Sequence, residues 1–192
     1  MSKKFELTTE SIMYFGRTLF RIKALVGFGE IEAGELGGYI EKEENLDQSG
    51  NAWVSGNAWV SGNACVFDDA RVSGNARVYG NAWVSGDAWV YGNACVSGNA
   101  WVSGNAWVSG NARVSKPAHL LQVGCVGSRH GFTTFYRTKN KRIHVACGCF
   151  SGDIDEFEKK VISTHAGTKH EKTYKLAIEL AKAQIEDVEG RE

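Results

Sequence analysis

Residues 49–66 read SGNAWVSGNAWVSGNACV, which is three copies of one six-residue unit. The register continues without insertion to residue 120, so twelve hexads follow one another. Asp-Asp replaces the usual Gly-Asn in the fourth hexad (67–72), and Lys-Pro replaces it in the twelfth (115–120). A repeat of short, fixed period predicts units that stack and together bury one continuous core.

Each hexad combines a corner with a short strand. Glycine and asparagine both tolerate positive φ, so the Gly-Asn pair predicts a tight corner. Side chains alternate in the Ala-x-Val piece that follows, which places Ala and Val on the inner face and x on the outer face. Three hexads make one three-sided coil, so the repeat predicts four coils with a height of roughly 20 Å.

The unit resembles the hexapeptide-repeat, left-handed parallel β-helix family. Residues 54–59 fit its consensus of an aliphatic residue, a small residue, two variable residues, a small residue and one more. The resemblance implies left-handed coils, an exception to the usual right-handed crossover. We therefore expect a mainly β protein: an N-terminal β-hairpin cap (1–48), a left-handed parallel β-helix of about four coils (49–120) and a small C-terminal α+β domain (121–192).

The outward x position of the hexads holds all six tryptophans of the chain. Residues 18 apart should stack, which gives three columns: Trp53, Arg71, Trp89 and Trp107; Trp59, Arg77, Cys95 and Arg113; and Cys65, Trp83, Trp101 and His119. Soluble monomers rarely leave such an apolar surface bare, and Trp and Arg are enriched at binding hot spots. We expect the Trp and Arg members to form the interface of a homo-oligomer, a trimer by the family resemblance; another partner, or packing within the chain, is the alternative.

The flanking segments have different patterns. Residues 11–25 read as a hairpin that turns at Gly16-Arg17 and caps the open end of the coil. Strands are expected at 122–126, 133–138 and 142–150, and helices from Ser151 or Asp153 to about 164 and over 169–186. The inward stripes predicted for these helices are Ile154, Phe157, Val161 and Ile162, and Tyr174, Ala177, Ile178, Ala181 and Ile185.

Residues 15–25 (FGRTLFRIKAL) and 34–46 (GELGGYIEKEENL) are similar to the N-terminal region of a family of bacteriophage and prophage hexapeptide-repeat proteins. That resemblance implies a phage origin, and hence the cytoplasm of an infected or lysogenic bacterial host. Such proteins are often labelled acyltransferases, which use a histidine as general base. Residues 1–118 contain no histidine, so His119 is the one candidate within the repeat, and we expect no catalytic residue.

A stretch without carboxylates provides candidate anion ligands. No Asp or Glu occurs over 88–152, whereas basic and aromatic side chains alternate there and residues 127–131 form a Gly-bounded loop. Basic side chains beside aromatic rings suit a nucleotide or another phosphate-bearing ligand. The candidates are Arg129, His130, Phe135, Tyr136, Arg137, Lys139, Lys141 and Arg142. The alternative is a solvated hairpin tip.

Five cysteines and no secretory signal favour reduced thiols. Cys147 and Cys149 should share one strand face and could join Cys125 at a zinc ion, but Cys-x-Cys is not the usual knuckle spacing. We therefore expect no metal and no cofactor. The net charge is zero, and no apolar run approaches the roughly 20 residues that cross a bilayer, so no membrane contact is expected.

These patterns favour a non-enzymatic, self-associating phage accessory protein that acts as a binding or scaffolding module. Binding of a host protein or a nucleotide, in opposition to host defence, is the expected setting by analogy with the family. The alternatives are an acyl-CoA-dependent acyltransferase and a virion structural or assembly protein.

Overall fold

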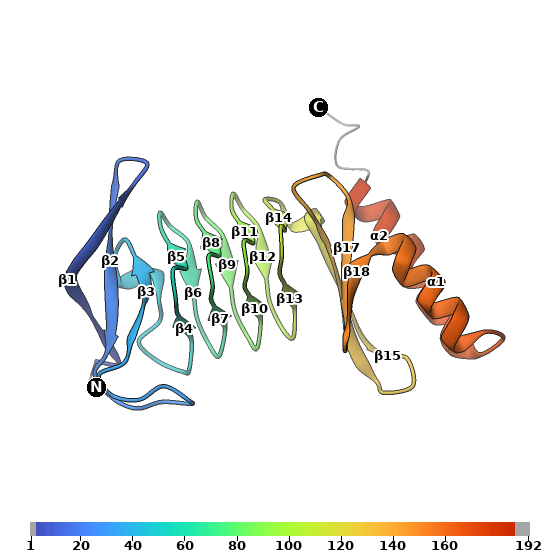
Figure 1. Ribbon diagram of the computed structural model, residues 1–192, viewed down its shortest axis with the longest axis horizontal. Coiled ribbons are helices and arrows are strands. Elements are labelled where there is room, and N and C mark those ends of the chain that lie inside the picture. Colours follow the sequence, from blue (N-terminus) through green and yellow to red (C-terminus); the bar gives the residue numbers. More distant parts are fainter. Residues whose placement is uncertain (1–2, 187–192) are drawn as a thin grey trace.

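The repeat forms a β-solenoid of about four turns in the computed structural model, which describes residues 3–186 (Figure 1). Eleven hexads each contribute a two-residue strand. These strands are β4 (Trp53–Val54), β5 (Trp59–Val60), β6 (Cys65–Val66), β7 (Arg71–Val72), β8 (Arg77–Val78), β9 (Trp83–Val84), β10 (Trp89–Val90), β11 (Cys95–Val96), β12 (Trp101–Val102), β13 (Trp107–Val108) and β14 (Arg113–Val114).

The strands stack in parallel and in the predicted register. One face has the order β13-β10-β7-β4, a second has β12-β9-β6, and the third continues from β3 through β5, β8 and β11 to β14. Residues 18 apart pair, as Val54 does with Val72. The Ala and Val side chains of these hexads are buried in one continuous core, which confirms the inward column from Val54 to Val114.

The corners use glycine and asparagine in different ways. Glycine has the positive φ, for example 65° at Gly56, whereas no asparagine of the described chain does. The asparagines instead form a ladder, in which Nδ2 of Asn63 donates to Oδ1 of Asn81 at 3.1 Å. Asp68 takes the glycine position of the fourth hexad with a φ of 58°, and its Oδ2 accepts a hydrogen bond from the Gly86 N–H. A short polar side chain tolerates this conformation better than other non-glycine residues do.

The N-terminal segment covers the first coil. Strands β1 (Phe5–Tyr14) and β2 (Arg17–Ala24) form an antiparallel hairpin, and β3 (Leu36–Ile40) pairs with β2 and with β5. The short 3₁₀ helix η1 (Glu43–Asn45) follows. Phe5, Ile22, Ile40 and Leu46 add their side chains to the solenoid core.

Two glycines allow β3 to lie directly on the first coil. A Cβ at Gly37 would lie 2.6 Å from the Val54 carbonyl oxygen, and one at Gly38 would lie 2.5 Å from that of Ala58. Strand pairing of the solenoid therefore begins before the first hexad, with a rung that lacks the hexad sequence.

The twelfth hexad does not form a coil strand, contrary to the prediction. Residues Pro117–His119 form the 3₁₀ helix η2, and the chain then enters β15 (Leu120–Val126). His119 was expected to point outward, but it is 3% exposed, and its Nδ1 lies 3.2 Å from the Ser115 backbone nitrogen, which donates to it. Proline has no N–H and a fixed φ, so it ends the strand pattern here.

The C-terminal region is a four-stranded antiparallel sheet with two helices on its far side (Figure 1). The remaining elements are β16 (Gly131–Arg137), β17 (Ile143–Cys147), β18 (Phe150–Asp153), α1 (Ile154–His165) and α2 (Lys169–Glu186). Asp153 caps α1 in a capping box with Glu156. The predicted inward residues of both helices are buried except Ile162, which is exposed because it lies one position round the helix from Val161.

The two faces of this sheet pack against different partners. Tyr136 belongs to the solenoid core, and its hydroxyl lies 3.1 Å from Ser109 Oγ. Phe135 and Val145 belong to a second core with the two helices. The sheet therefore closes the last coil on one side and carries α1 and α2 on the other. No helix within residues 3–186 is long and apolar enough to cross a membrane.

Candidate functional site

The six tryptophans of the outward column fall into two groups. Trp53 is 3% exposed and packs against Phe5 and Phe28, with ring centroids 6.5 and 5.4 Å away. Trp59 is 8% exposed and packs against Tyr14 and Tyr79, at 4.6 and 5.7 Å. Both were expected at an intermolecular interface. They are instead covered within the chain, mainly because the N-terminal segment folds back over the first coil.

The other four tryptophans are between 41% and 54% exposed and form two strips. The first strip is Trp89 and Trp107, which stack with centroids 5.5 Å apart and planes 10° apart on the β13-β10-β7-β4 face. The second strip is Phe67, Trp83 and Trp101, with edge-to-face contacts of 6.0 Å on the β12-β9-β6 face. These strips are the exposed remainder of the predicted interface.

The arginines of the outward column have partners within the chain. Arg77 donates to the Tyr14 hydroxyl at 2.8 Å, and Arg113 donates to the backbone carbonyls of Asn93 and Ala112. Arg71 pairs with Glu30 at 2.6 Å, and its guanidinium lies 5.6 Å from the ring centre of Trp89. Arg71 therefore lies where the covered part of its face meets the exposed part.

The predicted anion-binding residues do not form one site. Phe135 and Tyr136 are fully buried core residues, on opposite faces of β16, and do not line a ligand site. Arg129 and His130 lie in the turn before β16, whereas the group Arg137, Lys139, Lys141 and Arg142 lies at its other end, and Arg142 pairs with Asp153 at 2.9 Å. The strand separates the two basic groups by about 20 Å at roughly 3.3 Å per residue. The sequence showed the basic composition but not this separation.

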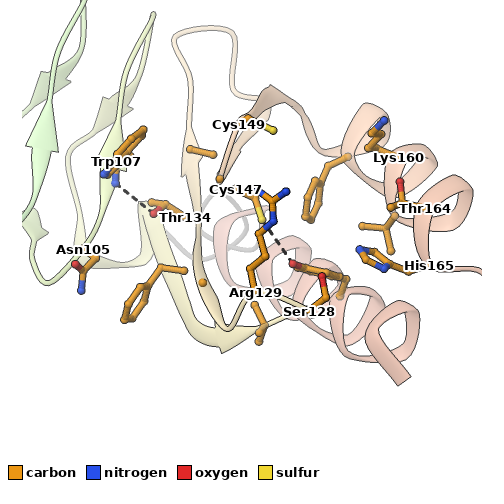
Figure 2. A pocket seen from close by; sticks show the side chains of 18 residues that line it. Asn105, Trp107, Ser128, Arg129, Thr134, Cys147, Cys149, Lys160, Thr164 and His165 are labelled. Carbon is orange, nitrogen blue, oxygen red and sulfur yellow. Dashed lines mark hydrogen bonds between the residues drawn. The ribbon is translucent and has the colours of Figure 1, made fainter. Parts of the chain in front are cut away.

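A pocket of about 440 Å³ opens beside the turn that holds Arg129, between the last coil, the sheet and α1 (Figure 2). Its basic lining residues are Arg129, Lys160 and His165, and its aromatic ones are Trp107, Phe132, Phe157 and Tyr174. No carboxylate is among the lining residues that the structure describes. The pocket thus combines positive charge with aromatic surface.

Hydrogen bonds fix the floor of this pocket. The backbone N–H of Trp107 donates to Thr134 Oγ1 at 3.3 Å, which connects the last coil to β16 (Figure 2). The Thr133 hydroxyl donates to Cys147 Sγ at 3.1 Å, and the Tyr174 hydroxyl lies 3.8 Å from the same sulfur. Burial, with the neighbouring thiol, raises the pKa of Tyr174 to about 12 and keeps the phenol neutral.

The cysteines are arranged differently from the expectation. Cys147 ends β17, Gly148 turns the chain with a φ of 56°, and exposed Cys149 lies in that turn, so the two thiols do not share a strand face. Both line the pocket. In the described part of the chain, no three His, Cys, Asp or Glu side chains group in a way that could hold a metal ion.

Sequence reasoning found one side of the pocket and missed the other. Arg129 was a candidate because of its basic loop, but Lys160 and His165 lie on α1, with no motif linking them to it. Tyr174 was predicted as a core residue, and an apolar stripe does not reveal that a core ring also borders a cavity. Their common location follows from the packing of α1 and α2 on the sheet.

The comparisons with known proteins support the fold. A family model for the YdcK beta solenoid repeat matches residues 70–86 and 88–104, in the middle coils. The chain is therefore similar to that repeat over part of its solenoid, in agreement with the structure. A search of curated proteins finds no match.

Proposed function

We propose that this protein is a non-catalytic binding and scaffolding module that assembles with copies of itself through its exposed tryptophans. The observation that carries the proposal is the pair of strips, with four tryptophans between 41% and 54% exposed on two faces of one small solenoid. Each of these side chains is about half exposed, so it offers a partner on the order of half of the roughly 150–250 Å² that a fully buried aromatic side chain covers, at a low cost in conformational entropy. Surfaces of this kind mark interaction sites in soluble proteins.

The two strips favour a ring. The strips lie on different faces, so a contact between the first strip of one copy and the second strip of another is head-to-tail. Head-to-tail contacts form a closed ring when the rotation between neighbouring copies adds up to a full turn. A ring of three is the assembly that the hexapeptide-repeat resemblance implies. The third face carries no strip, because Trp59 and Arg77 are engaged by the hairpin residue Tyr14.

The setting of a phage accessory protein, acting on a host partner or a nucleotide, is supported by the resemblance of residues 15–25 and 34–46 to phage and prophage proteins. A structural or assembly role in the virion would use the same self-association. His119 does not support the acyltransferase alternative, because its ring is buried and already accepts a hydrogen bond from the Ser115 backbone N–H.

Native mass spectrometry and light scattering test the self-association. We expect wild-type protein to be a trimer at micromolar concentration, and both Trp89→Ser and the double variant Trp83→Ser/Trp101→Ser to dissociate. The matched control is Leu176→Ser/Leu180→Ser, which removes two comparably exposed apolar side chains from α2. A monomeric wild type, or strip variants that keep the wild-type mass, would overturn the proposal.

A further inference from the structure

The pocket at the end of the solenoid has the size of a small-molecule site. Its volume of about 440 Å³ lies within the range of ligand pockets, roughly 300–1,000 Å³. It lies at the junction of the last coil, the β15–β16 turn and α1, so three separate parts of the chain contribute to it (Figure 2). A site built across such a junction positions its side chains by tertiary packing.

The charges of Arg129 and Lys160 in this pocket are not neutralised by the residues that the structure describes. Arg129 and Lys160 form no ion pair with any residue of the described range 3–186, and no described lining residue is a carboxylate. His165 stacks on Tyr174, with centroids 5.7 Å apart, which holds the imidazole at the pocket wall. Guanidinium and ammonium groups around one cavity favour an anion, and phosphate accepts hydrogen bonds from both.

The coil side of the pocket carries Trp107, whereas two further aromatic side chains, Phe157 and Tyr174, lie beside the basic residues of α1. Trp107 and Asn105 lie at one end in Figure 2, and Lys160, Thr164 and His165 on α1 lie at the other. Trp107 stacks on Trp89, yet its side chain is 43% exposed and lines the pocket. A planar ring at this end would gain stacking energy, because aromatic side chains bind any nucleobase through its π face.

From these two ends we infer that the pocket is a binding site for a nucleotide, with the base at Trp107 and the phosphate among Arg129, Lys160 and His165. The chemical basis is that one cavity combines an aromatic surface, which includes Trp107 on the coil side, with basic side chains from the β15–β16 turn and α1. One chain supplies all of these residues, but Trp107 also belongs to the first strip, so the base end of the site borders the self-association surface proposed above.

The test uses the full-length protein and isothermal titration calorimetry. The probes are the common ribonucleoside monophosphates, with the matching nucleosides and inorganic phosphate as partial ligands. We expect at least one monophosphate to bind below millimolar concentration, and its nucleoside and inorganic phosphate to bind at least about tenfold more weakly. Arg129→Gln and Lys160→Gln should each weaken binding roughly tenfold, as expected for one charge-assisted hydrogen bond.

Lys139→Gln is the matched control, since it removes another exposed cation, at the other end of β16, and should leave binding unchanged. Trp107→Leu should weaken binding of the monophosphate but leave binding of inorganic phosphate unchanged. The inference is overturned if no monophosphate binds at millimolar concentration, if Lys139→Gln weakens binding as much as Arg129→Gln, or if the nucleoside binds as well as its monophosphate. Native mass of each variant separates a loss of this site from a loss of assembly.

Discussion

The first and last coils of the solenoid place the same side chain at the same hexad position and give it opposite environments. Trp53 is buried under Phe5 and Phe28, whereas Trp107, three rungs along the same face, is 43% exposed. The hexad determines that each tryptophan points outward. Whether that tryptophan meets solvent depends on which other segment of the chain folds over it.

The two ends also differ in how charge is arranged. At the covered end, two carboxylates are paired within the chain: Glu41 accepts from Arg17 at 2.7 Å, and Glu30 accepts from Arg71. The Gly62 N–H, which donates to Glu41, holds the pKa of that carboxyl below its usual value. At the far end, the described cations of the pocket have no such carboxylate partners. Among the described residues, charges are thus paired within the chain at one end of the solenoid, whereas Arg129 and Lys160 form no ion pair at the other.

The strongest test of this comparison is the loss of a covered tryptophan. Trp53→Ala should lower the free energy of unfolding by about 3–5 kcal/mol, because it leaves a cavity beneath the N-terminal segment. Trp101→Ala, which removes an exposed ring, should change the stability of the monomer by no more than about 0.5 kcal/mol. Urea denaturation at several protein concentrations measures both values and separates folding from assembly.

The substitution Trp53→Phe sharpens the same point. The Trp53 indole N–H is buried without a hydrogen-bond partner in the described structure, so phenylalanine keeps much of the packing and removes an unsatisfied donor. Trp53→Phe should therefore lower the free energy of unfolding by much less than Trp53→Ala does. Equal losses for Trp53→Ala and Trp101→Ala would mean that burial does not distinguish the two ends.

A smaller effect concerns Lys4, which lies beneath the covered end. Its ammonium donates to the backbone carbonyls of Ser49 and Ala52, and burial lowers its pKa from 10.5 to about 8, although Asp47 and Asp69 oppose the shift. The folded state then binds fewer protons than the unfolded state between these pKa values. Stability relative to Lys4→Met should therefore rise with pH, by on the order of 3 kcal/mol between pH 8 and pH 10.5.

Denaturation curves of wild type and Lys4→Met across this range give the difference directly. The contributions of other titrating groups to the pH dependence cancel in the comparison. Tyr136, whose pKa is raised by its burial, is one of these groups. A difference that stays constant with pH would show that the Lys4 ammonium is as well solvated when folded as when unfolded.

The smallest effect is expected at the boundary between the covered and exposed parts. Glu30 is exposed, and the hydrogen bond from Arg71 lowers its pKa, so its stabilisation is present above the usual carboxylate range and is lost as pH falls through the lowered pKa. Glu30→Gln should lower the denaturation midpoint slightly at neutral pH and converge with wild type in acid. If Glu30→Gln lowered the stability as much as Trp53→Ala does, Glu30 would have to be counted among the core contacts.

Local patterns predicted much of the fold. The six-residue period gave the inward column and the stacking of residues 18 apart, and the 3.6-residue period gave α2 with its bounds at Lys169 and Glu186. The errors occurred where a local pattern met a distant segment. Pro117 ended the hexads one unit early, and Phe135 and Tyr136 were assigned to a ligand site although each belongs to a core.

The sequence by itself determined the solenoid, its rungs and the direction of each hexad side chain, because these follow from contacts that repeat at a fixed separation along the chain. Only the tertiary structure decided which tryptophans are covered and which side chains meet around the pocket. Trp53 meets Phe5, and Arg129 shares a cavity with Lys160, across long and irregular sequence separations. Such contacts depend on how whole elements pack, and no periodic signal in the sequence encodes them.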